Sequence, residues 1–445
     1  MARNIDEMTD RKSAEARRLQ SRAHELIPGG AHTYAKGDDQ FPEIAPSHIV
    51  RGSGCHAWDV DGHEYIEYGM GLRSVTLGHG YQRVVDAVGR CLPNGTNFTR
   101  PSVLEVECAE AFLENMPGSQ MVKFSKDGSD TTTAAVRLAR AHTGRDLVAR
   151  CSDQPFFSVD DWFIGSTAMN AGIPKATRDL TLGFRYNDLS SLQTLFANYP
   201  AQIACIILEA ETTIPPAPGY FAGLERLCRE NGVVFILDEM ITGFRWHNGG
   251  AQAVYGIDPD LSTFGKGLGN GFSVSALAGK REIMERGGIS HSGERVFLLS
   301  TTHGAETHSL AAAIEVMHIY RTEPVVEHLH RVGSTLKTEI NAIANTLGIA
   351  AFFEVLGRPC NLVYATRDPQ GQPAQAFRTL FLQELVKQGI LAPSLVVSYS
   401  HGDSEISRTI AAVENALKIY SQALETSPER YLIGPSVQPV FRRYS

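Results

Sequence analysis

The segment from residue 232 to residue 280 constrains the fold of this chain most. It opens with the apolar run 233–237. An uninterrupted apolar run of this length is typical of a strand buried on both faces of a parallel sheet. The run ends on Asp238 and Glu239, so two carboxylates stand where the buried strand emerges. Because ligands of open α/β sheets bind at the carboxyl ends of the strands, the pattern predicts a ligand site at Asp238.

Lys266 follows in a glycine-rich setting, GKGLGNG. Glycines permit positive φ and close approach of the backbone, which a lysine bonded to a planar cofactor requires around it. Pyridoxal phosphate needs an acid for its pyridine nitrogen and a lysine for a Schiff base. Either half alone also fits a core strand with a surface acid pair, or a loop with a solvated lysine. Together they favour Asp238 and Lys266 as catalytic groups that bind pyridoxal 5'-phosphate.

A glycine-containing turn, SKDGSD, precedes an alanine-rich helical pattern and follows a short predicted strand at 121–124. The turn brings Gly128 and Ser129 to the start of the helix. A helix N-terminus offers unpaired N–H groups and the positive end of the dipole to an anion. Serine and aspartate are also ordinary helix caps, so the turn alone is a weak signal. Its position in the strand–helix unit that opens the large domain predicts the phosphate site.

Composition excludes several classes of protein. The charge is mildly acidic, with 41 Lys+Arg against 49 Asp+Glu, and no basic run favours nucleic acid or an anionic membrane. No apolar run reaches the roughly eighteen residues of a membrane span, and the polar N-terminus has no signal-peptide core. The 7 cysteines are scattered and never spaced as CxxC. We therefore expect reduced thiols, a cytoplasmic protein and no metal site.

The order of patterns predicts an α/β fold. Strand 203–209, helix 221–231 and the strand before Asp238 form a right-handed crossover unit. Residues 8–26 predict an amphipathic helix. Between 326 and 424, two long helical patterns flank apolar stretches, which indicates a smaller α+β domain. We predict an N-terminal segment at 1–75, a large domain at 76–325, a small domain at 326–426 and an extended tail at 427–445.

Two motifs carry a resemblance to a known family. LDEMITGFR, which contains Asp238, and TFGKGLGNG, which contains Lys266, resemble the signature of class III, fold-type I aminotransferases. Within these, the chain is most similar to glutamate-1-semialdehyde 2,1-aminomutases and their aminotransferase relatives. The resemblance extends from Ile27 to about Leu424. It implies a large domain with a mostly parallel sheet sandwiched by helices, and a smaller α+β domain built from both chain ends.

The resemblance also implies the residues that hold the cofactor. Asp127, Gly128 and Ser129 match the family's Ser-Gly-Thr phosphate loop, with Asp127 as a departure, because a carboxylate beside a phosphate is unfavourable unless it points away. The segment 153–158 matches a Tyr-His-Gly landmark whose aromatic ring stacks on the pyridine. Phe156 is our choice for that ring; Phe157 is the alternative, and both also fit an apolar core.

Three further cofactor contacts are expected. Glu211 follows the strand 203–209 at the loop edge, and Met240 shares the face of Asp238 in extended geometry. In the resembling family, the threonine that matches Thr302 reaches the phosphate of the partner subunit's cofactor. A homodimer with shared active sites is therefore implied.

Substrate groups are less defined by the sequence. Arg73, in a glycine-rich segment, could bind a carboxylate or phosphate bidentately, or could be a surface arginine. Lys36 stands where the aminomutase has a carboxylate-gripping arginine, and a lysine lacks the guanidinium fork.

Three functions follow. The first is an aminotransferase that moves an amino group from an amino-acid donor to an aldehyde or keto acceptor, such as a keto sugar or keto acid. The second is glutamate-1-semialdehyde 2,1-aminomutase. The third is a non-catalytic ligand-binding module, against which the pair Asp238 and Lys266 argues, because a binding module needs neither group.

Overall fold

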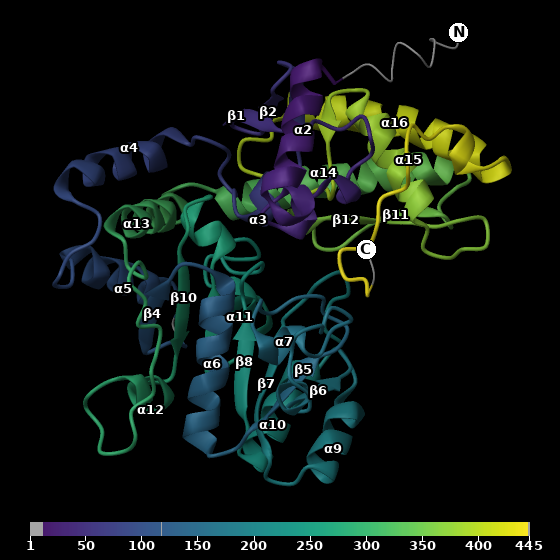
Figure 1. The fold of residues 1–445 in the computed structure, drawn as a ribbon. Helices are drawn as coiled ribbons and strands as arrows, with labels where there is room; N and C mark the ends of the chain where they lie inside the picture. The colour runs from purple at the N-terminus through teal and green to yellow at the C-terminus, as the bar shows by residue number, and fades with distance from the viewer. Residues whose placement is uncertain (1–11, 117, 444–445) are drawn as a thin grey trace. The chain divides into compact units, whose positions relative to one another are not determined.

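A computed structural model of the chain describes residues 12–116 and 118–443, which divide into two units (Figure 1). The central unit consists of Arg73–Val75 and Gln82–Val326. The terminal unit consists of the described residues up to Leu72, together with Thr76–Tyr81 and Glu327–Arg442. The terminal unit therefore draws on both ends of the chain.

The central unit is built on a 7-stranded sheet in the order β4-β10-β9-β8-β7-β5-β6. Its strands are β4 (Met121–Ser125), β5 (Leu147–Cys151), β6 (Thr181–Phe184), β7 (Ile203–Glu209), β8 (Val234–Asp238), β9 (Leu261–Phe264) and β10 (Ser275–Gly279). Strands β5 to β9 pair in parallel, whereas β10 runs antiparallel to both of its neighbours. The mostly parallel sheet predicted from the sequence is confirmed.

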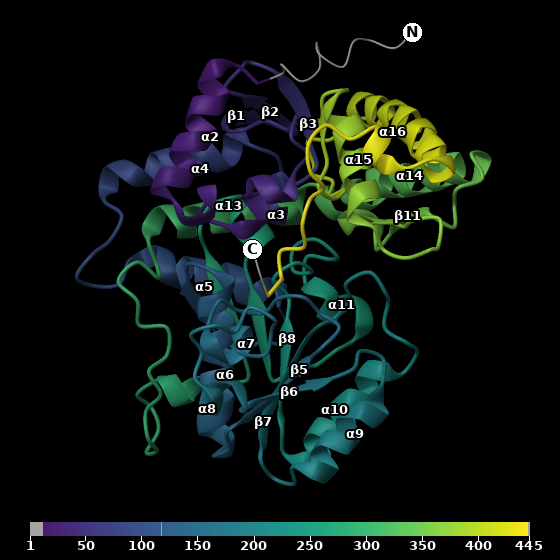
Figure 2. The same ribbon diagram turned by 45° about the vertical axis from the view of Figure 1, so that its right-hand side comes forward.

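Helices cover both faces of this sheet, with α6 on one face and α9 and α10 on the other (Figure 2). The helices of the unit are α4 (Gln82–Cys91), α5 (Val103–Asn115), α6 (Gly128–Thr143), α7 (Asp161–Ile164), α8 (Lys175–Arg178), α9 (Leu189–Asn198), α10 (Tyr220–Asn231), α11 (Gly250–Tyr255), α12 (Arg281–Met284) and α13 (Thr307–Thr322). Because helices shield it on both sides, every residue of β7 and β8 is buried. This explains the apolar runs from which the strands were predicted.

The register of β7 against β8 positions the ligand site. Glu209 pairs with Asp238 across the two strands, and Asp238 pairs with Thr263 on β9. Glu209 and Asp238 therefore end neighbouring parallel strands, with Thr263 beside them one residue before the end of β9, at the edge where ligands of open α/β sheets bind.

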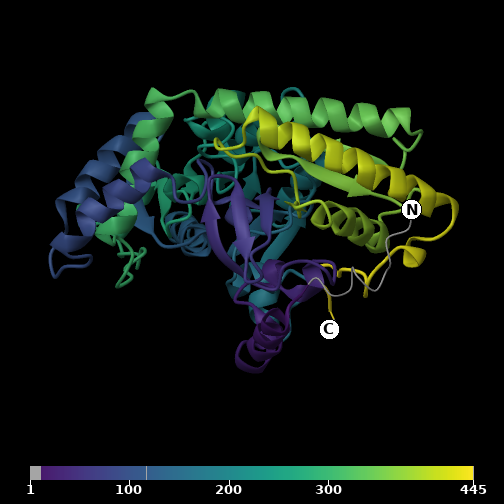
Figure 3. The ribbon, with the colours of Figure 1, turned by 90° about the horizontal axis from the view of Figure 1, so that it is seen from above.

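The terminal unit contains a 4-stranded sheet in the order β1-β2-β3-β13 and a 2-stranded hairpin, β11-β12. Its elements are α2 (Ala14–Leu26), β1 (Ile49–Ser53), β2 (His56–Asp59), β3 (Glu64–Glu67), α14 (Val325–Thr346), β11 (Phe353–Leu356), β12 (Val363–Thr366), α15 (Gln375–Val386), β13 (Ile390–Leu391) and α16 (Asp403–Glu425); α3 (Met70–Arg73) ends in the central unit. The long helices α14 and α16 are prominent in Figure 3. Helix α2 begins at Ala14, later than the predicted 8–26, of which 8–11 lie outside the described residues.

The prediction of two long helical patterns between 326 and 424 is incomplete, because α15 is a third helix. Its buried residues are Phe377, Thr379, Leu380, Phe381, Leu382, Gln383, Leu385 and Val386. A helix that is buried on most sides lacks the polar face from which an amphipathic period is recognised.

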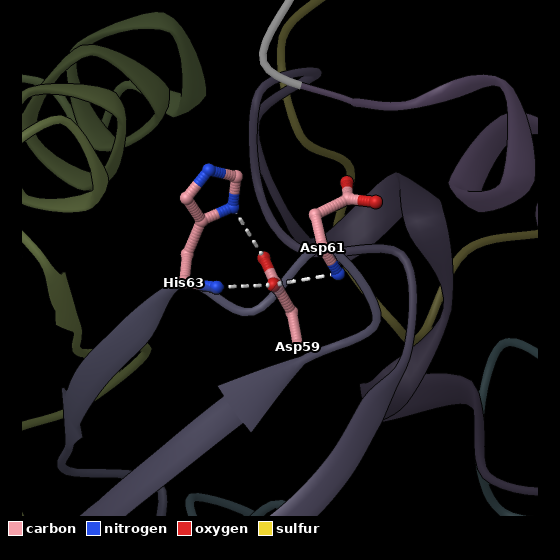
Figure 4. Close-up of side chains that lie close together, drawn as sticks. All are labelled: Asp59, Asp61 and His63. Carbon is pink, nitrogen blue, oxygen red and sulfur yellow. Dashed lines mark hydrogen bonds and ion pairs between the residues drawn. The ribbon is translucent and has the colours of Figure 1, made fainter.

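A cluster of two acids and a histidine closes the turn between β2 and β3 (Figure 4). The Asp59 Oδ1 atom accepts hydrogen bonds from the backbone N–H groups of Asp61 (3.0 Å) and His63 (2.8 Å). The Asp59 Oδ2 atom accepts the Tyr65 hydroxyl at 3.0 Å and lies 3.0 Å from the His63 Nδ1 atom. Donors of the chain itself therefore satisfy this carboxylate, and the cluster is a turn-stabilising device.

The described part of the tail lies on the terminal unit. The Val437 N–H donates to the Thr379 hydroxyl at 2.9 Å, and the Gln438 N–H donates to the Asp39 carbonyl at 2.8 Å. Within the described residues, no helix is both long and apolar enough to cross a membrane.

We expect His401 to make the stability of the protein depend on pH. Its ring is fully buried, its centroid lies 4.4 Å from that of Tyr68, and its Nδ1 atom accepts the Ser398 N–H at 2.9 Å. Burial lowers the pKa of His401 to about 3, and Glu405 opposes this only in part. The pKa of histidine in the unfolded state is about 6.5, so the unfolded state takes up a proton first as pH falls. The contribution of neutral, buried His401 to the free energy of unfolding is therefore fully present above about pH 6.5 and is lost progressively below it. About 2 kcal/mol should disappear between pH 6.5 and pH 5.

Chemical denaturation at several pH values measures this effect. The His401→Asn variant should show a shallower dependence of unfolding free energy on pH in that window. Equal slopes for the variant and the wild type would contradict the assignment.

Candidate active site

A cavity of about 480 Å³ lies in the central unit at the carboxyl ends of β7 and β8. Its lining combines charged groups, a helix N-terminus and aromatic rings: Ser74, Lys126, Asp127, Gly128, Ser129, Pro155, Phe156, Phe157, Val159, Glu209, Asp238, Met240, Ile241, Gly265, Lys266, Gly271, Phe272, Ser273 and Val274. The cavity thus unites Asp238, Lys266 and the predicted phosphate turn.

Asp238 ends β8 and is 3% exposed. Its Oδ1 atom accepts hydrogen bonds from the Met240 N–H at 2.9 Å and from the Thr263 hydroxyl at 3.3 Å. Burial raises the pKa of Asp238 to about 6, while Lys266 and these two donors act in the opposite direction. The carboxylate is therefore supplied with donors that favour its ionised form at neutral pH.

Lys266 begins a short 3-10 helix, Lys266–Gly269, and its backbone φ is +38°. Positive φ is uncommon for a residue with a side chain, and such conformations gather at functional sites. Burial lowers the pKa of Lys266, although Asp238 and Glu209 raise it in part. A lowered pKa increases the fraction of neutral amine, which is the nucleophilic form of lysine.

A second lysine, Lys126, also lines the cavity but has a different environment. Its Nζ atom donates to Glu306 Oε2 at 2.8 Å and to the Ser309 hydroxyl at 3.0 Å. The Lys126 amine is therefore engaged by an ion pair and a hydrogen bond. The two cavity lysines therefore differ in chemistry, and Lys266 is the better nucleophile.

The N-terminus of α6 provides the anion-binding part of the cavity. Asp127 is the N-cap, and its Oδ1 atom accepts the Asp130 N–H at 3.0 Å, so the carboxylate is engaged in capping. The Ser129 Oγ atom accepts the Val159 N–H at 3.0 Å, which leaves the serine proton able to donate to a ligand. The helix dipole and this hydroxyl together suit a phosphate.

Two glycines allow Met240 to fill the base of the cavity. A Cβ atom on Gly128 would lie 2.9 Å from the Met240 Sδ atom, and one on Gly265 would lie 2.8 Å from it. Glycine at both positions therefore lets the α6 turn and the Lys266 loop approach each other across one side chain.

The two candidate aromatic residues have different surroundings. Phe157 is 2% exposed, whereas Phe156 is 42% exposed, and both line the cavity. Each packs edge-on against Phe163, with ring centroids 5.6 Å apart for Phe156 and 5.7 Å apart for Phe157. Phe156 has more free ring surface with which to contact a ligand.

Four predicted residues lie outside this lining. Glu211 is buried and accepts hydrogen bonds from the Trp246 indole at 3.0 Å and from the Tyr255 hydroxyl. Thr302 is exposed, with its carbonyl bonded to the Asn97 amide at 2.9 Å.

The two predicted substrate residues also lie outside the lining. Arg73 precedes the lining residue Ser74, and its charge acts on Glu209 and Lys266. Lys36 lines a separate cavity of about 500 Å³ in the terminal unit.

Among the charged residues of the lining, sequence reasoning missed Lys126 and Glu209. Glu209 ends β7 as Asp238 ends β8, so the acid that ends the strand was the available signal. Lys126 carries no such signal. It stands in the turn SKDGSD, where the pattern points to Gly128 and Ser129 and not to the lysine.

The residues of the cavity fit pyridoxal phosphate. The α6 N-terminus suits a phosphate, the Asp238 carboxylate suits a ring nitrogen, and the buried Lys266 amine suits the cofactor aldehyde. The Glu209 Oε2 atom is buried without a hydrogen-bond partner, as expected for a polar atom that faces a ligand. The fold and this cavity together define a pyridoxal-phosphate-dependent enzyme of fold type I.

Comparisons with known proteins identify the family. The family model "Aminotransferase class-III" matches residues 34–391, and the chain belongs to this family. It is 34% identical over 432 residues to a glutamate-1-semialdehyde 2,1-aminomutase of Pelodictyon phaeoclathratiforme, covering 91% of this chain and 98% of the relative. A relative of the same name from Geotalea daltonii is 33% identical over 425 residues, covering 90% of this chain and 98% of its own length.

Solved structures agree on the fold. The FumI protein of Sphingopyxis sp. MTA144, in its PLP internal aldimine form, aligns with a TM-score of 0.84 at 25% identity, covering 93% of this chain and 98% of that one. A glutamate-1-semialdehyde-aminomutase of Pseudomonas aeruginosa PAO1 aligns with a TM-score of 0.81 at 18% identity, covering 93% and 96%. The fold is therefore shared by relatives with different names.

We expect Lys266→Ala to abolish turnover without unfolding the protein, because the side chain faces a cavity and packs little of the core. Turnover should fall to below about a hundredth of wild type, a loss of at least roughly 3 kcal/mol in transition-state stabilisation. Steady-state assays together with circular dichroism measure both effects. The control is Lys123→Ala, which removes a half-buried lysine outside this cavity and should retain turnover. Turnover of Lys266→Ala above that limit would refute the assignment.

Proposed function

We propose that this protein is an aminotransferase that moves an amino group from an amino-acid donor to an aldehyde or keto acceptor. The observation that carries the proposal is the pairing of two opposite environments in one cavity. Lys266 has a lowered pKa through burial, and Asp238 receives two hydrogen-bond donors. A neutral amine and an ionised carboxylate are the groups that amino transfer on pyridoxal phosphate requires.

Each residue has a role in proton transfer or binding. The Lys266 Nζ atom would take the α-proton from the bound amino donor and return a proton, because burial lowers its pKa and so favours the uncharged, basic form of the amine. Asp238 keeps the proton on the ring nitrogen of the cofactor through its negative charge. Ser129 and the N–H groups of α6 hold the phosphate, and Phe156 covers the ring. When bound, pyridoxal phosphate supplies an electrophilic carbon and an electron-accepting ring.

Two basic residues are assigned to binding of the substrate. We assign Arg73 to an anionic group of the substrate, since its charge acts on Glu209 and Lys266 in the cavity. We assign Lys36 to a second anionic group on the resemblance alone, since it lines a cavity of the terminal unit and is a point charge without bidentate geometry.

Glutamate-1-semialdehyde 2,1-aminomutase is the alternative function, and the names of the curated relatives favour it. Three differences favour intermolecular transfer instead. Lys36 replaces the carboxylate-gripping arginine, the segment 155–157 replaces the Tyr-His-Gly landmark, and the segment 290–295 replaces the gating segment of the aminomutase. All three affect where a substrate would bind, whereas Asp238 and Lys266 are retained.

We expect the purified protein to convert glutamate-1-semialdehyde to 5-aminolevulinate poorly. Losing a bidentate charge-assisted pair costs about 1.5–3 kcal/mol, or roughly ten- to a hundredfold in binding. Lys36→Arg should improve this conversion if the fork is the missing group. A wild-type specificity constant of about 10⁴ M⁻¹s⁻¹ or more would make the aminomutase the correct function. A screen of amino donors, then of carbonyl acceptors, followed through the absorbance of the bound cofactor, would identify the substrates.

We also propose a homodimer in which Thr302 of each subunit completes the cofactor site of the other. The exposure of Thr302 outside the cavity lining supports this, since an exposed hydroxyl is available to a partner subunit. Symmetric dimers are the commonest form of oligomer.

Mixing two inactive variants tests the shared site. Thr302→Asp should be inactive because a carboxylate repels the phosphate, and Lys266→Ala is inactive for lack of the amine. In a mixed dimer, the subunit that keeps Lys266 receives an intact Thr302 from its partner. Equal mixing should therefore recover about a quarter of wild-type turnover, since half of the dimers are mixed and each has one intact site. No recovery, or a fully active monomer at nanomolar concentration, would contradict the proposal.

A further inference from the structure

Glu209 is the one acid of the cavity that the assignments above leave without a role. It lies on the parallel strand next to Asp238 and in register with it. Its side chain lines the cavity and is 5% exposed. Its Oε2 atom is buried and has no hydrogen-bond partner. A buried polar atom without a partner costs free energy, and because Glu209 lines the cavity, a ligand bound there is the candidate partner.

The chain treats its two adjacent acids differently. Asp238 receives the Met240 N–H and the Thr263 hydroxyl, and these donors stabilise a negative charge. No hydrogen bond reaches the Glu209 Oε2 atom from the described residues. An ionised carboxylate is costly in such surroundings, whereas a protonated carboxyl is tolerated and becomes a donor.

The charges around Glu209 agree with this geometry. Three charged groups act on it: Asp238 at the end of β8, Lys266 in the 3-10 helix after β9, and Arg73 before α4. Burial, and after it Asp238, raises the pKa of Glu209 to about 8, while Lys266 and Arg73 lower it in part. Burial raises the pKa of Asp238 only to about 6. Of the two acids, Glu209 therefore has the more strongly raised pKa and is the better candidate to hold a proton, as in other sites where two acids have separated roles.

Gln154 holds the backbone of Glu209 in place. The Gln154 Nε2 atom donates to the Glu209 carbonyl at 2.8 Å, and the Glu209 N–H donates to Gln154 Oε1 at 2.7 Å. One buried amide thus holds both backbone groups of Glu209. Because Gln154 precedes the lining segment 155–157, the same amide ties the aromatic wall of the cavity to the end of β7.

The chemistry of the cofactor identifies the acceptor. Pyridoxal phosphate carries four polar groups: the phosphate, the ring nitrogen, the aldehyde and the phenolic oxygen. The α6 N-terminus, Asp238 and Lys266 account for the first three. We propose that Glu209, as a neutral carboxylic acid, donates a hydrogen bond from its unpartnered oxygen to the phenolic oxygen of the cofactor. This inference rests on cofactor binding and is independent of the substrates.

Such a donor has two consequences. A hydrogen bond to the phenolic oxygen stabilises its ionised form, so the cofactor loses its proton at a lower pH. A neutral Glu209 also avoids a second negative charge beside Asp238, which would otherwise weaken the grip of Asp238 on the ring nitrogen.

Two substitutions separate a donor from a charge. Glu209→Gln keeps the shape and an N–H donor, whereas Glu209→Met keeps the approximate volume without a donor. We expect Glu209→Met to bind pyridoxal phosphate about ten- to a hundredfold more weakly by equilibrium dialysis. Its visible absorbance should titrate at a higher pH than that of the wild type. Glu209→Gln should bind within about threefold of wild type and titrate close to it.

A matched control and a direct readout complete the test. Glu225→Gln changes a glutamate of the same unit whose carboxylate accepts the Asp258 N–H outside the cavity, and should alter neither binding nor titration. Infrared difference spectra of the wild-type holoenzyme against Glu209→Gln should contain the carbonyl band of a protonated carboxyl at pH 7. This readout remains informative if Glu209→Met does not fold.

Three results would overturn the inference. They are unchanged cofactor binding in Glu209→Met, equal weakening in Glu209→Gln and Glu209→Met, and absence of the protonated-carboxyl band. None of them bears on the choice between aminotransferase and aminomutase, because no substrate is present in these measurements. Failure of the proposed function would instead be seen in the donor and acceptor assays.

Discussion

The parallel pairing of β7 with β8 is the interaction on which the site depends. It brings Glu209 and Asp238 side by side at the edge of a sheet whose strands are buried on both faces. Two carboxylates so close in a low-dielectric setting cannot both be ionised without a large cost. The chain resolves this by giving donors to Asp238 and none to the Glu209 Oε2 atom. The donors to Asp238, the unpartnered oxygen of Glu209 and the buried Lys266 are therefore all supplied by the chain itself.

Lys266 and Lys126 illustrate how environment separates identical side chains. Lys126 is paired with Glu306 at 2.8 Å and directly precedes the N-cap of α6 in the sequence. Lys266 is buried beside the two acids and has a lowered pKa. A cation suits phosphate binding, whereas a neutral amine suits attack on an aldehyde. One cavity can thus contain a lysine suited to phosphate binding and another suited to reaction with the aldehyde.

Much of this site could be predicted from the sequence, because its signals are local. A buried run that ends in Asp238, glycines around Lys266 and a turn before a helix at Gly128 each reflect a backbone requirement. Glu209 and Glu211 are different, since they stand two residues apart in the sequence and only the exact end of β7, at Glu209, distinguishes them. The structure has Glu209 in the cavity and engages Glu211 with Trp246 and Tyr255.

Features set by tertiary packing were beyond the sequence. The helix α15 has no amphipathic period, because its sides are mostly buried. The ion pair of Lys126 joins residues far apart in the chain, and no local pattern announces it. Asp127 was a departure from the family's loop, and its capping bond to Asp130 explains how a carboxylate is tolerated at this turn.

The central claim is that Lys266, and not the other lysine of the cavity, forms the bond to the cofactor. Borohydride reduction of the holoenzyme fixes pyridoxal phosphate to its lysine, and peptide mass spectrometry then locates the added mass. The account predicts the label on the peptide that contains Lys266 and an unmodified Lys126. A label on Lys126, or no covalent label after reduction of a protein with bound cofactor, would contradict it.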